Sequence, residues 1–379
     1  MQNLLSRTAG FLMAGILLTG IAGCGISVPF IESEETAYDA GMTLLDSREY
    51  REALARFEAA RSQGEDSARL YRGIGIADFY LGDYEGAEAA FRTALADCGG
   101  IPNAMSYDLA YYLADTYRAQ DRTEEAIGIY DAILDLKPRE KIAHYLRGMI
   151  YLRRGDHESA LKDFQVILDE RPRPYDQILS IYEALSRSGY AAEGKGILED
   201  ILADSADTMT NYEKGRFYYS LGDSDSAKRF LEEANNDSSI RVSDKIPIVI
   251  LLGEVEQNLG DDAGAISTYR RFLQEDQSQA SIYNALGACE MRMGSYSDAL
   301  TDFQIGLSLD DASQNPAILR NMAAVYEYMG NFDVAAQRME EYLKLVPTDE
   351  EALRENIFLT TRRREAEENE ESLNAGNGG

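Results

Sequence analysis

The chain has 379 residues and carries 66 acidic against 37 basic side chains, for a formal charge of −29. Hydrophobic residues make up 45% of the chain, which is enough for a core and excludes disorder throughout. The acidity excludes a general nucleic-acid binder, which needs basic patches that displace counterions from phosphates, and it opposes binding to an anionic membrane surface.

Residues 1–23 have the order of a secretory signal peptide. Arg7 and the amino terminus supply positive charge, and the run Thr8–Gly23 carries no charge at all. Its apolar centre spans only Phe11–Ile21, whereas a membrane-spanning helix needs about 20 apolar residues. The segment is therefore predicted to direct export rather than to cross a membrane.

The signal ends in small residues and a cysteine, Ile21-Ala22-Gly23-Cys24. This resembles the lipobox of bacterial lipoproteins, in which the signal is cleaved before the cysteine and the sulfur is acylated. The resemblance implies lipid chains of the palmitate type on Cys24, a tether over residues 24–33, and a place in the bacterial cell envelope on the extracytoplasmic side of a membrane. Two or more acyl chains anchor a protein stably. The alternatives are an ordinary signal peptide with a chance cysteine, or an uncleaved anchor.

A short phrase recurs along the rest of the chain, each time between two amphipathic stretches. It reads Gly-Asp-Tyr-Glu-Gly-Ala at 82–87 and Gly-Asp-His-Glu-Ser-Ala at 155–160. Further copies begin at Gly222, Gly260, Gly294 and Gly330, which are 38, 34 and 36 residues apart. This pattern resembles the tetratricopeptide repeat (TPR), a helix–turn–helix unit of 34 residues.

Alignment on the alanine that follows each phrase divides residues 34–349 into nine repeats. Position 8 of the repeat is small in most copies, as at Gly75, because the second helix crosses closely there. Position 24 is a large apolar residue such as Phe91, and position 20 is Ala except in repeat 5. Repeat 5 also has Tyr182 at position 8, so we expect a wider crossing there. The repeats start at residues 34, 68, 107, 141, 175, 208, 246, 280 and 316.

The resemblance implies an all-α protein, an α-solenoid of about nine TPR repeats wound as a right-handed superhelix. One helix pair cannot bury its apolar face alone, so neighbouring pairs stack into a continuous core. In this family the first helix of each repeat lines the concave face.

The end of the array needs a polar cap. We predict a capping helix over 350–364, with Asp349 as its N-cap. The apolar residues expected to face repeat 9 are Leu353, Ile357 and Phe358. Residues 365–379 are acidic and Asn/Gly-rich, and are predicted to be a disordered tail.

The sequence offers no catalytic set. The chain has only two His and three Cys. His144 falls at a buried repeat position and His157 in a turn, while Cys289 occupies a core position and Cys98 has no His near it in sequence. Carboxylates are spread over solvated helix faces, so no pair stands out as acid and base. We therefore expect no enzymatic activity, no metal, no cofactor and no small-molecule substrate.

Repeat positions 2, 5, 9, 12 and 13 face the concave surface in this family. Across nine repeats these 45 positions hold eight Arg and eight acidic residues, so the face is neutral. Eight are aromatic, about twice the 9% of the whole chain. Tyr and Arg often carry the binding energy at protein interfaces. The residues that we predict to contact a protein or peptide partner are Tyr38, Arg72, Phe79, Tyr111, Arg118, Tyr145, Arg153, Arg187, Tyr212, Arg216 and Tyr219.

Two further observations bear on this surface. The TPR pattern itself favours Tyr at positions 5 and 12, so part of the excess of aromatic residues on this face reflects the repeat rather than a partner. Position 5 has no Lys and position 9 no Asn, so the clamp with which some family members hold a C-terminal carboxylate is missing.

The sequence favours a lipid-anchored scaffold for protein or peptide partners. The alternative is an envelope assembly factor for a pilus, a secretin or an outer-membrane protein.

Overall fold

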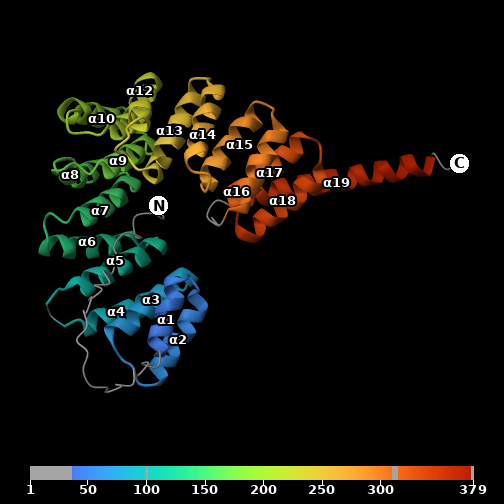
Figure 1. Ribbon diagram of the computed structural model, residues 1–379. Helices are drawn as coiled ribbons and strands as arrows, with labels where there is room; N and C mark the ends of the chain where they lie inside the picture. Colours follow the sequence, from blue (N-terminus) through green and yellow to red (C-terminus); the bar gives the residue numbers. More distant parts are fainter. Residues whose placement is uncertain (1–35, 100, 310–314, 377–379) are drawn as a thin grey trace, which may run out of the picture. The chain divides into compact units, whose positions relative to one another are not determined.

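The computed structural model describes residues 36–99, 101–309 and 315–376. The predicted signal peptide, Cys24 and the tether lie outside these residues. Within them the regular secondary structure is entirely helical (Figure 1), which confirms the predicted all-α class. Among the helices described, none combines the length and the apolarity that crossing a bilayer requires.

The chain divides into two compact units, and the boundary follows Ile129. A helix between the units, α6 (Thr123–Leu136), begins in the first and ends in the second. The first unit also contains α1 (Ala37–Asp46), α2 (Tyr50–Ser62), α3 (Ala68–Leu81), α4 (Tyr84–Asp97) and α5 (Ala104–Ala119).

The second unit contains the remaining helices, with a short 3-10 helix, η1 (Val242–Lys245), before α13. They are α7 (Lys141–Arg153), α8 (His157–Leu168), α9 (Tyr175–Arg187), α10 (Ala191–Ser205), α11 (Asn211–Leu221), α12 (Ser224–Asn235), α13 (Ile246–Asn258), α14 (Asp262–Glu275), α15 (Ala280–Arg292), α16 (Tyr296–Ser308), α17 (Asn315–Tyr328), α18 (Phe332–Leu345) and α19 (Glu350–Gly376).

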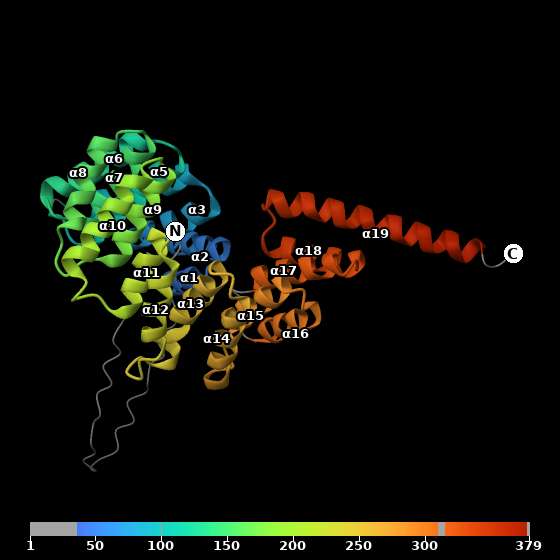
Figure 2. The ribbon, with the colours of Figure 1, turned by 90° about the horizontal axis from the view of Figure 1, so that it is seen from above.

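Within each unit the helices pack as consecutive hairpins (Figures 1 and 2). In the first unit α1 packs on α2 and α3 on α4, and α2 and α4 each pack on the first helix of the next hairpin. The second unit repeats this pattern from α7 and α8 to α17 and α18, and α18 packs on α19. Over the residues that the structure describes, nine successive helix pairs and a final helix match the predicted α-solenoid.

A ring packed on a glycine holds the two helices of a hairpin together. A Cβ atom added at Gly75 would lie 2.6 Å from Cε1 of Phe91, and one at Gly148 would lie 2.7 Å from Cε1 of Phe164. Both rings are fully buried. Real Cβ atoms do not approach so closely, so the second helix reaches this distance only because position 8 lacks a side chain. This confirms the predicted close crossing.

The recurring Gly-Asp phrase is the turn between the two helices. Gly82 and Gly222 end α3 and α11 with φ of 83° and 82°, a left-handed conformation that favours glycine. The aspartates that follow them are the N-caps of the second helices. Asp83 accepts a hydrogen bond from the backbone N–H of Gly86 at 3.0 Å, and Asp223 accepts one from that of Ser226 at 3.1 Å.

In repeat 5 the large and the small residue of the helix crossing have exchanged helices. Tyr182 fills position 8, and the residue opposite, Gly194, is the only glycine at position 20. A Cβ atom at Gly194 would lie 3.0 Å from Cδ2 of Tyr182. The Tyr182 hydroxyl donates to the backbone carbonyl of Ser220 at 2.6 Å, which links this repeat to the next. A small residue on the second helix therefore makes room for the large one on the first.

The last helix is longer than predicted. We expect it to end at residue 364, but α19 continues to Gly376 (Figures 1 and 2). The residues after 364 include five Glu together with Ala and Leu, which are good helix formers, so the segment keeps its helical conformation. The predicted boundary between a capping helix and a disordered tail is therefore corrected.

The predicted orientation of α19 is also wrong. Over the part of α19 whose burial is described, residues 350–365, Ala352 and Leu359 are fully buried, whereas Leu353, Ile357 and Phe358 are 43%, 66% and 43% exposed. Ala352 and Leu359 lie seven residues apart on one helix face, and the small Ala352 permits close approach to α18. Asp349 is the N-cap as predicted: its carboxylate accepts from the backbone N–H of Ala352 at 3.0 Å.

The contact between ring and glycine gives the first prediction. Gly148→Ala should lower the free energy of unfolding by about 1–3 kcal/mol, because the new methyl group overlaps the buried Phe164 ring. The matched control is Gly196→Ala in α10, where a Cβ atom would meet nothing within 4 Å. That change should be neutral or stabilise by up to about 1 kcal/mol. Urea unfolding followed by circular dichroism measures both, and equal stability of the two variants would contradict the packing argument.

Candidate partner-binding surface

The predicted contact residues lie on the first helices of the hairpins in both units. In the first unit they form a group that we call the first-unit face: Tyr38 on α1, Arg72 and Phe79 on α3, and Tyr111 and Arg118 on α5. In the second unit they form the second-unit face: Tyr145 and Arg153 on α7, Arg187 on α9, and Tyr212, Arg216 and Tyr219 on α11.

The aromatic residues of the first-unit face are held in place by their neighbours. The ring centroids of Tyr38 and Phe57 are 5.9 Å apart. The Arg69 guanidinium lies 5.8 Å from the centroid of the Tyr38 ring. Burial raises the pKa of Tyr38, which keeps the hydroxyl protonated. Phe79 meets Tyr80 edge-on at 5.4 Å. Tyr38 and Phe79 are half-buried, and these contacts fix the positions of their rings.

The two arginines of the first-unit face already have acidic partners. Arg72 Nε lies 2.5 Å from Asp108 Oδ2, which joins α3 to α5. Arg118 Nη1 lies 2.6 Å from Asp115 Oδ1 on its own helix. Burial raises the pKa of Asp115, and Arg118 only partly opposes this shift. Both cations therefore contribute to the structure of the face itself.

The second-unit face has the same internal pairing on α11. Arg216 forms an ion pair with Asp176 of α9, and its guanidinium lies 5.5 Å from the Tyr212 ring centroid. The Tyr219 hydroxyl hydrogen-bonds Glu254 of α13; burial raises the pKa of this carboxyl, and the hydrogen bond partly offsets the shift. Tyr212 and Tyr219 remain half-buried.

Arg153 and Arg187 differ from the other predicted cations. Both are exposed, and neither forms an ion pair with any residue that the structure describes. Each is the last residue of its helix, where a positive charge complements the helix dipole. They are the positive groups of the second-unit face that a partner can reach without breaking an internal salt bridge.

Both histidines and the buried Cys289 make contacts within the fold. His144 is 9% exposed, and its Nδ1 lies 2.7 Å from Asp163 Oδ1. His157 begins α8 and stacks on Tyr190 with ring centroids 3.8 Å apart. Cys289 is fully buried, as expected for a core position, and burial raises its thiol pKa to about 11. Within the described part of the chain, His, Cys, Asp and Glu form no group of three that could hold a metal ion.

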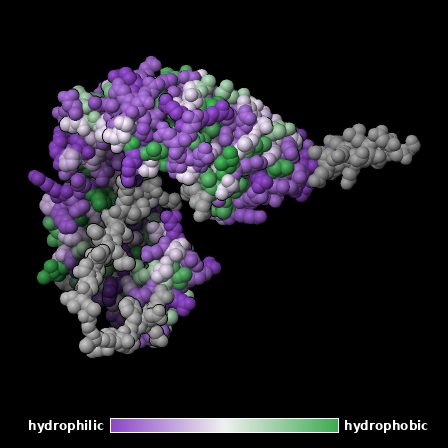
Figure 3. Space-filling model, in the orientation of Figure 1, coloured by the Kyte–Doolittle hydropathy of each residue, from purple (hydrophilic) through white to green (hydrophobic). Residues whose placement is uncertain are grey.

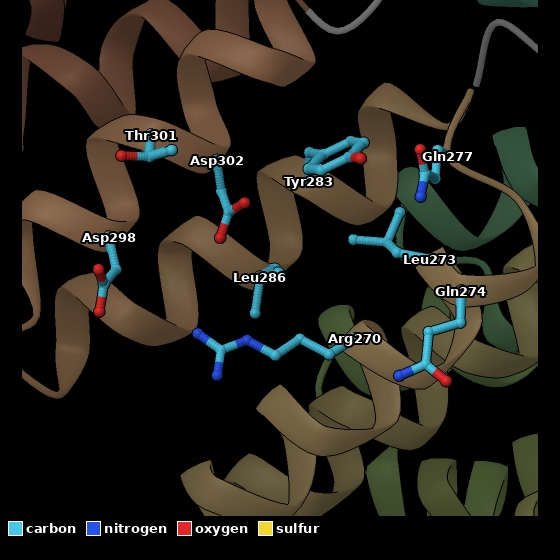
Figure 4. Close-up of a pocket in the computed structure, with 9 residues that line it drawn as sticks. All are labelled: Arg270, Leu273, Gln274, Gln277, Tyr283, Leu286, Asp298, Thr301 and Asp302. Carbon is cyan, nitrogen blue, oxygen red and sulfur yellow. The ribbon is translucent and has the colours of Figure 1, made fainter.

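Two clefts lie on the second unit, away from the predicted contact residues. The first has a volume of about 390 Å³ and lies between α14, α15 and α16 (Figure 4). The second has about 620 Å³ and lies beside α14. None of the predicted contact residues lines either cleft. The first cleft has an apolar and a charged part, formed by Leu273, Tyr283 and Leu286 and by Arg270, Asp298 and Asp302.

The first cleft was not predicted, because the predicted contact residues all lie on the first helices of the repeats. Much of the lining comes instead from second helices, α14 and α16. One sequence signal could have located it. Glu290 and Asp302 are two acidic residues twelve apart, one on each helix of the same hairpin.

Comparisons with known proteins identify the repeat. A family model described as tetratricopeptide repeat matches residues 38–102, 74–141 and 111–176, and a second model of the same description matches residues 210–236. TPR repeats are therefore present in both units.

More distant similarities extend over longer segments. Superkiller complex protein 3 of Mus musculus is 25% identical over 261 residues, which is 65% of this chain and 14% of that protein, so the chain spans a small part of this curated relative. A TPR protein from Parabacteroides merdae has a TM-score of 0.46 and 15% identity, over 78% of this chain and all of its own. A TPR protein from Thermus thermophilus has a TM-score of 0.38 and 17% identity, over 49% of this chain and 99% of its own.

The pair Arg72–Asp108 gives a prediction about the first-unit face. A double-mutant cycle with Arg72→Ala and Asp108→Ala should return a coupling energy of about 0.2–1 kcal/mol, because both side chains are partly exposed, at 25% and 42%. The measurement is urea unfolding of the wild-type chain, the two single variants and the double variant. A coupling energy indistinguishable from zero would show that the pair does not join the two repeats.

Proposed function

We propose that this protein is a lipid-anchored scaffold on the extracytoplasmic side of a bacterial membrane, which binds protein or peptide partners through its first helices and performs no catalysis. A TPR fold indicates a protein-interaction scaffold. The observation that carries the proposal is the composition of the two faces, whose Tyr and Arg side chains are half-buried or exposed and whose charges are largely balanced.

A face of this kind favours one class of partner. Tyr and Arg supply large contact areas and directional hydrogen bonds at protein interfaces. A polyanion would need a continuous positive surface, whereas Arg72 and Arg216 already have acidic partners. Hydrophilic residues predominate over the part of the second unit visible in Figure 3, and the hydrophobic ones form small separate patches. The described surface therefore favours a protein or peptide over a nucleic acid.

Arg153 and Arg187 are the strongest candidates for direct contact on the second-unit face. Their guanidinium groups are exposed and have no ion-pair partner among the described residues, so a partner carboxylate could bind them without displacing an internal one. The half-buried Tyr145 lies on the same helix as Arg153. We therefore propose that this face binds a segment with acidic side chains.

The proposed anchor rests on the amino-terminal sequence. A charged start, a short apolar run and Cys24 after small residues are together what export and acylation require. An acidic chain gains little from electrostatic attraction to an anionic membrane surface, so covalent lipid is the attachment that suits a charge of −29.

Charge reversal tests the second-unit face. Arg153→Glu combined with Arg187→Glu should reduce recovery of cross-linked partners from intact cells at least about tenfold, since interface hot spots contribute 2 kcal/mol or more. The matched control is Arg139→Glu with Lys195→Glu, which makes the same charge change at exposed positions outside the first helices. Equal recovery by both double variants would contradict the proposed face. Tyr145→Ala with Tyr212→Ala, two changes on the same face, provides a second test that leaves the charge unchanged and should also reduce recovery.

Acylation is tested separately. Cells fed labelled palmitate should incorporate it into the wild-type chain and into Cys98→Ser, but not into Cys24→Ser. The Cys24→Ser chain should also leave the membrane fraction, because it loses its anchor. Labelling of Cys24→Ser at the wild-type level would refute the lipoprotein assignment while leaving the partner-binding faces untouched.

A further inference from the structure

Residues twelve apart face each other across the two helices of a hairpin. In repeat 6 the rings of Tyr218 and Phe230 stack with centroids 5.4 Å apart. In repeat 7 the Thr268 hydroxyl donates to Glu256 Oε2 at 2.8 Å. The equivalent residues of repeat 8 are Glu290 on α15 and Asp302 on α16.

Repeat 8 is the only one of the nine aligned repeats in which both facing residues are acidic. The other pairs combine residues that can pack or hydrogen-bond without an added proton. They are Leu44 and Arg56, Asp78 and Ala90, Tyr117 and Ile129, Tyr151 and Asp163, Leu185 and Ile197, Tyr218 and Phe230, Glu256 and Thr268, and Tyr326 and Arg338.

The surroundings of the acidic pair leave one carboxylate oxygen without a donor. Glu290 is 1% exposed, and its Oε1 accepts from Arg270 Nη2 at 2.6 Å. Its Oε2 is buried and has no hydrogen-bond donor among the described residues. The two carboxyl groups can hydrogen-bond each other only when one of them holds a proton. A buried acceptor without a donor is costly, which favours protonation of the pair.

The charged and polar groups around Glu290 and Asp302 do not provide the missing hydrogen-bond donor. Arg270, from α14, is the cation that acts on both carboxyls. Asp298, one turn earlier on α16, adds negative charge. Tyr283 on α15 also lies near the pair: burial raises the pKa of its hydroxyl, and the negative charge of Asp302 raises it further. Figure 4 shows Arg270 extending past Leu286 toward the side of the cleft that holds Asp298 and Asp302.

Repeat 7 provides an internal comparison. Glu256 is also buried, at 5% exposed, and it occupies the same position as Glu290. It receives a hydrogen bond from Thr268, and Lys228 Nζ lies 3.3 Å from its other oxygen. Both of its carboxylate oxygens therefore have donors. The two repeats differ in that Asp302 stands where repeat 7 has Thr268.

We propose that Glu290 and Asp302 form a proton-binding site that makes the packing of α14 against α15 and α16 depend on pH. With one shared proton, the pair carries a single negative charge that Arg270 balances. When the proton leaves, two adjacent carboxylates face one guanidinium, and their repulsion is relieved by moving Asp302 toward the water of the first cleft. Asp302 lines the first cleft, so its displacement would alter that cleft.

The direction of the effect follows from the pKa values. Burial and the neighbouring carboxyl raise the pKa of Glu290 to about 7, and burial raises that of Asp302. The folded hairpin thus holds a proton that the unfolded chain releases near pH 4 to 5. Stabilisation by this proton is fully present below that range and is lost as pH rises through about 7.

Hydrogen exchange of the full chain at pH 6 and pH 8, corrected for intrinsic rates, tests the proposal. The open fraction of α15 and α16 should rise about tenfold between these pH values in the wild type, relative to the reference helices α11 and α12, which contain no His. Asp302→Thr, which installs the arrangement of repeat 7, should abolish the rise. Asp302→Asn should do the same with minimal change of shape. The control Glu256→Gln should retain the tenfold rise.

Two outcomes would overturn the proposal. One is a wild-type chain whose α15 and α16 open equally at pH 6 and pH 8. The other is persistence of the tenfold rise in both Asp302 variants, which would place the titrating group elsewhere. Because the two variants differ in shape, failure of one to fold leaves the other to decide.

Discussion

The architecture depends on one contact, which in most repeats is an aromatic or large aliphatic side chain packed directly on a glycine; repeats 3 and 9 have the small Ala114 and Ala323 at this position. Gly75 against Phe91 and Gly148 against Phe164 are two examples of the same arrangement. The contact sets the distance between the helices of a hairpin, and this distance positions the first helices that carry both proposed faces. Repeat 5, with Tyr182 against Gly194, shows that the requirement is for one small partner, whichever helix supplies it.

The fold could be predicted from sequence because its determinants repeat. Close crossings, turns and N-caps each depend on two or three residues at fixed spacing, so nine imperfect copies reinforce one another. The orientation of α19 could not be obtained this way, since no following hairpin exists in the repeat pattern to show which side is covered. A count of apolar residues favoured Leu353 and Ile357, whereas the small size of Ala352 decided the contact with α18.

The two proposed faces were only partly predictable. The sequence placed Arg72 and Arg216 among the predicted contact residues, but their pairing with Asp108 and Asp176 depends on which acidic residue a neighbouring repeat brings close. The neutral charge of this surface thus results partly from ion pairs between neighbouring repeats. Arg153 and Arg187 differ from the arginines in these pairs because their side chains are exposed. The acidic pair of repeat 8 also went unnoticed, because the family pattern describes small and large positions rather than which polar side chains face each other.

The order of packing has a consequence for how the chain acquires its structure. In each unit helices touch those one or two places away in the chain, as α13 touches α12, α14 and α15. Contacts of this kind have short sequence separations, and low contact order is associated with fast folding. A hairpin that emerges from the ribosome finds its neighbour on the amino-terminal side already formed. Assembly can therefore proceed by addition at the growing end, without waiting for distant segments.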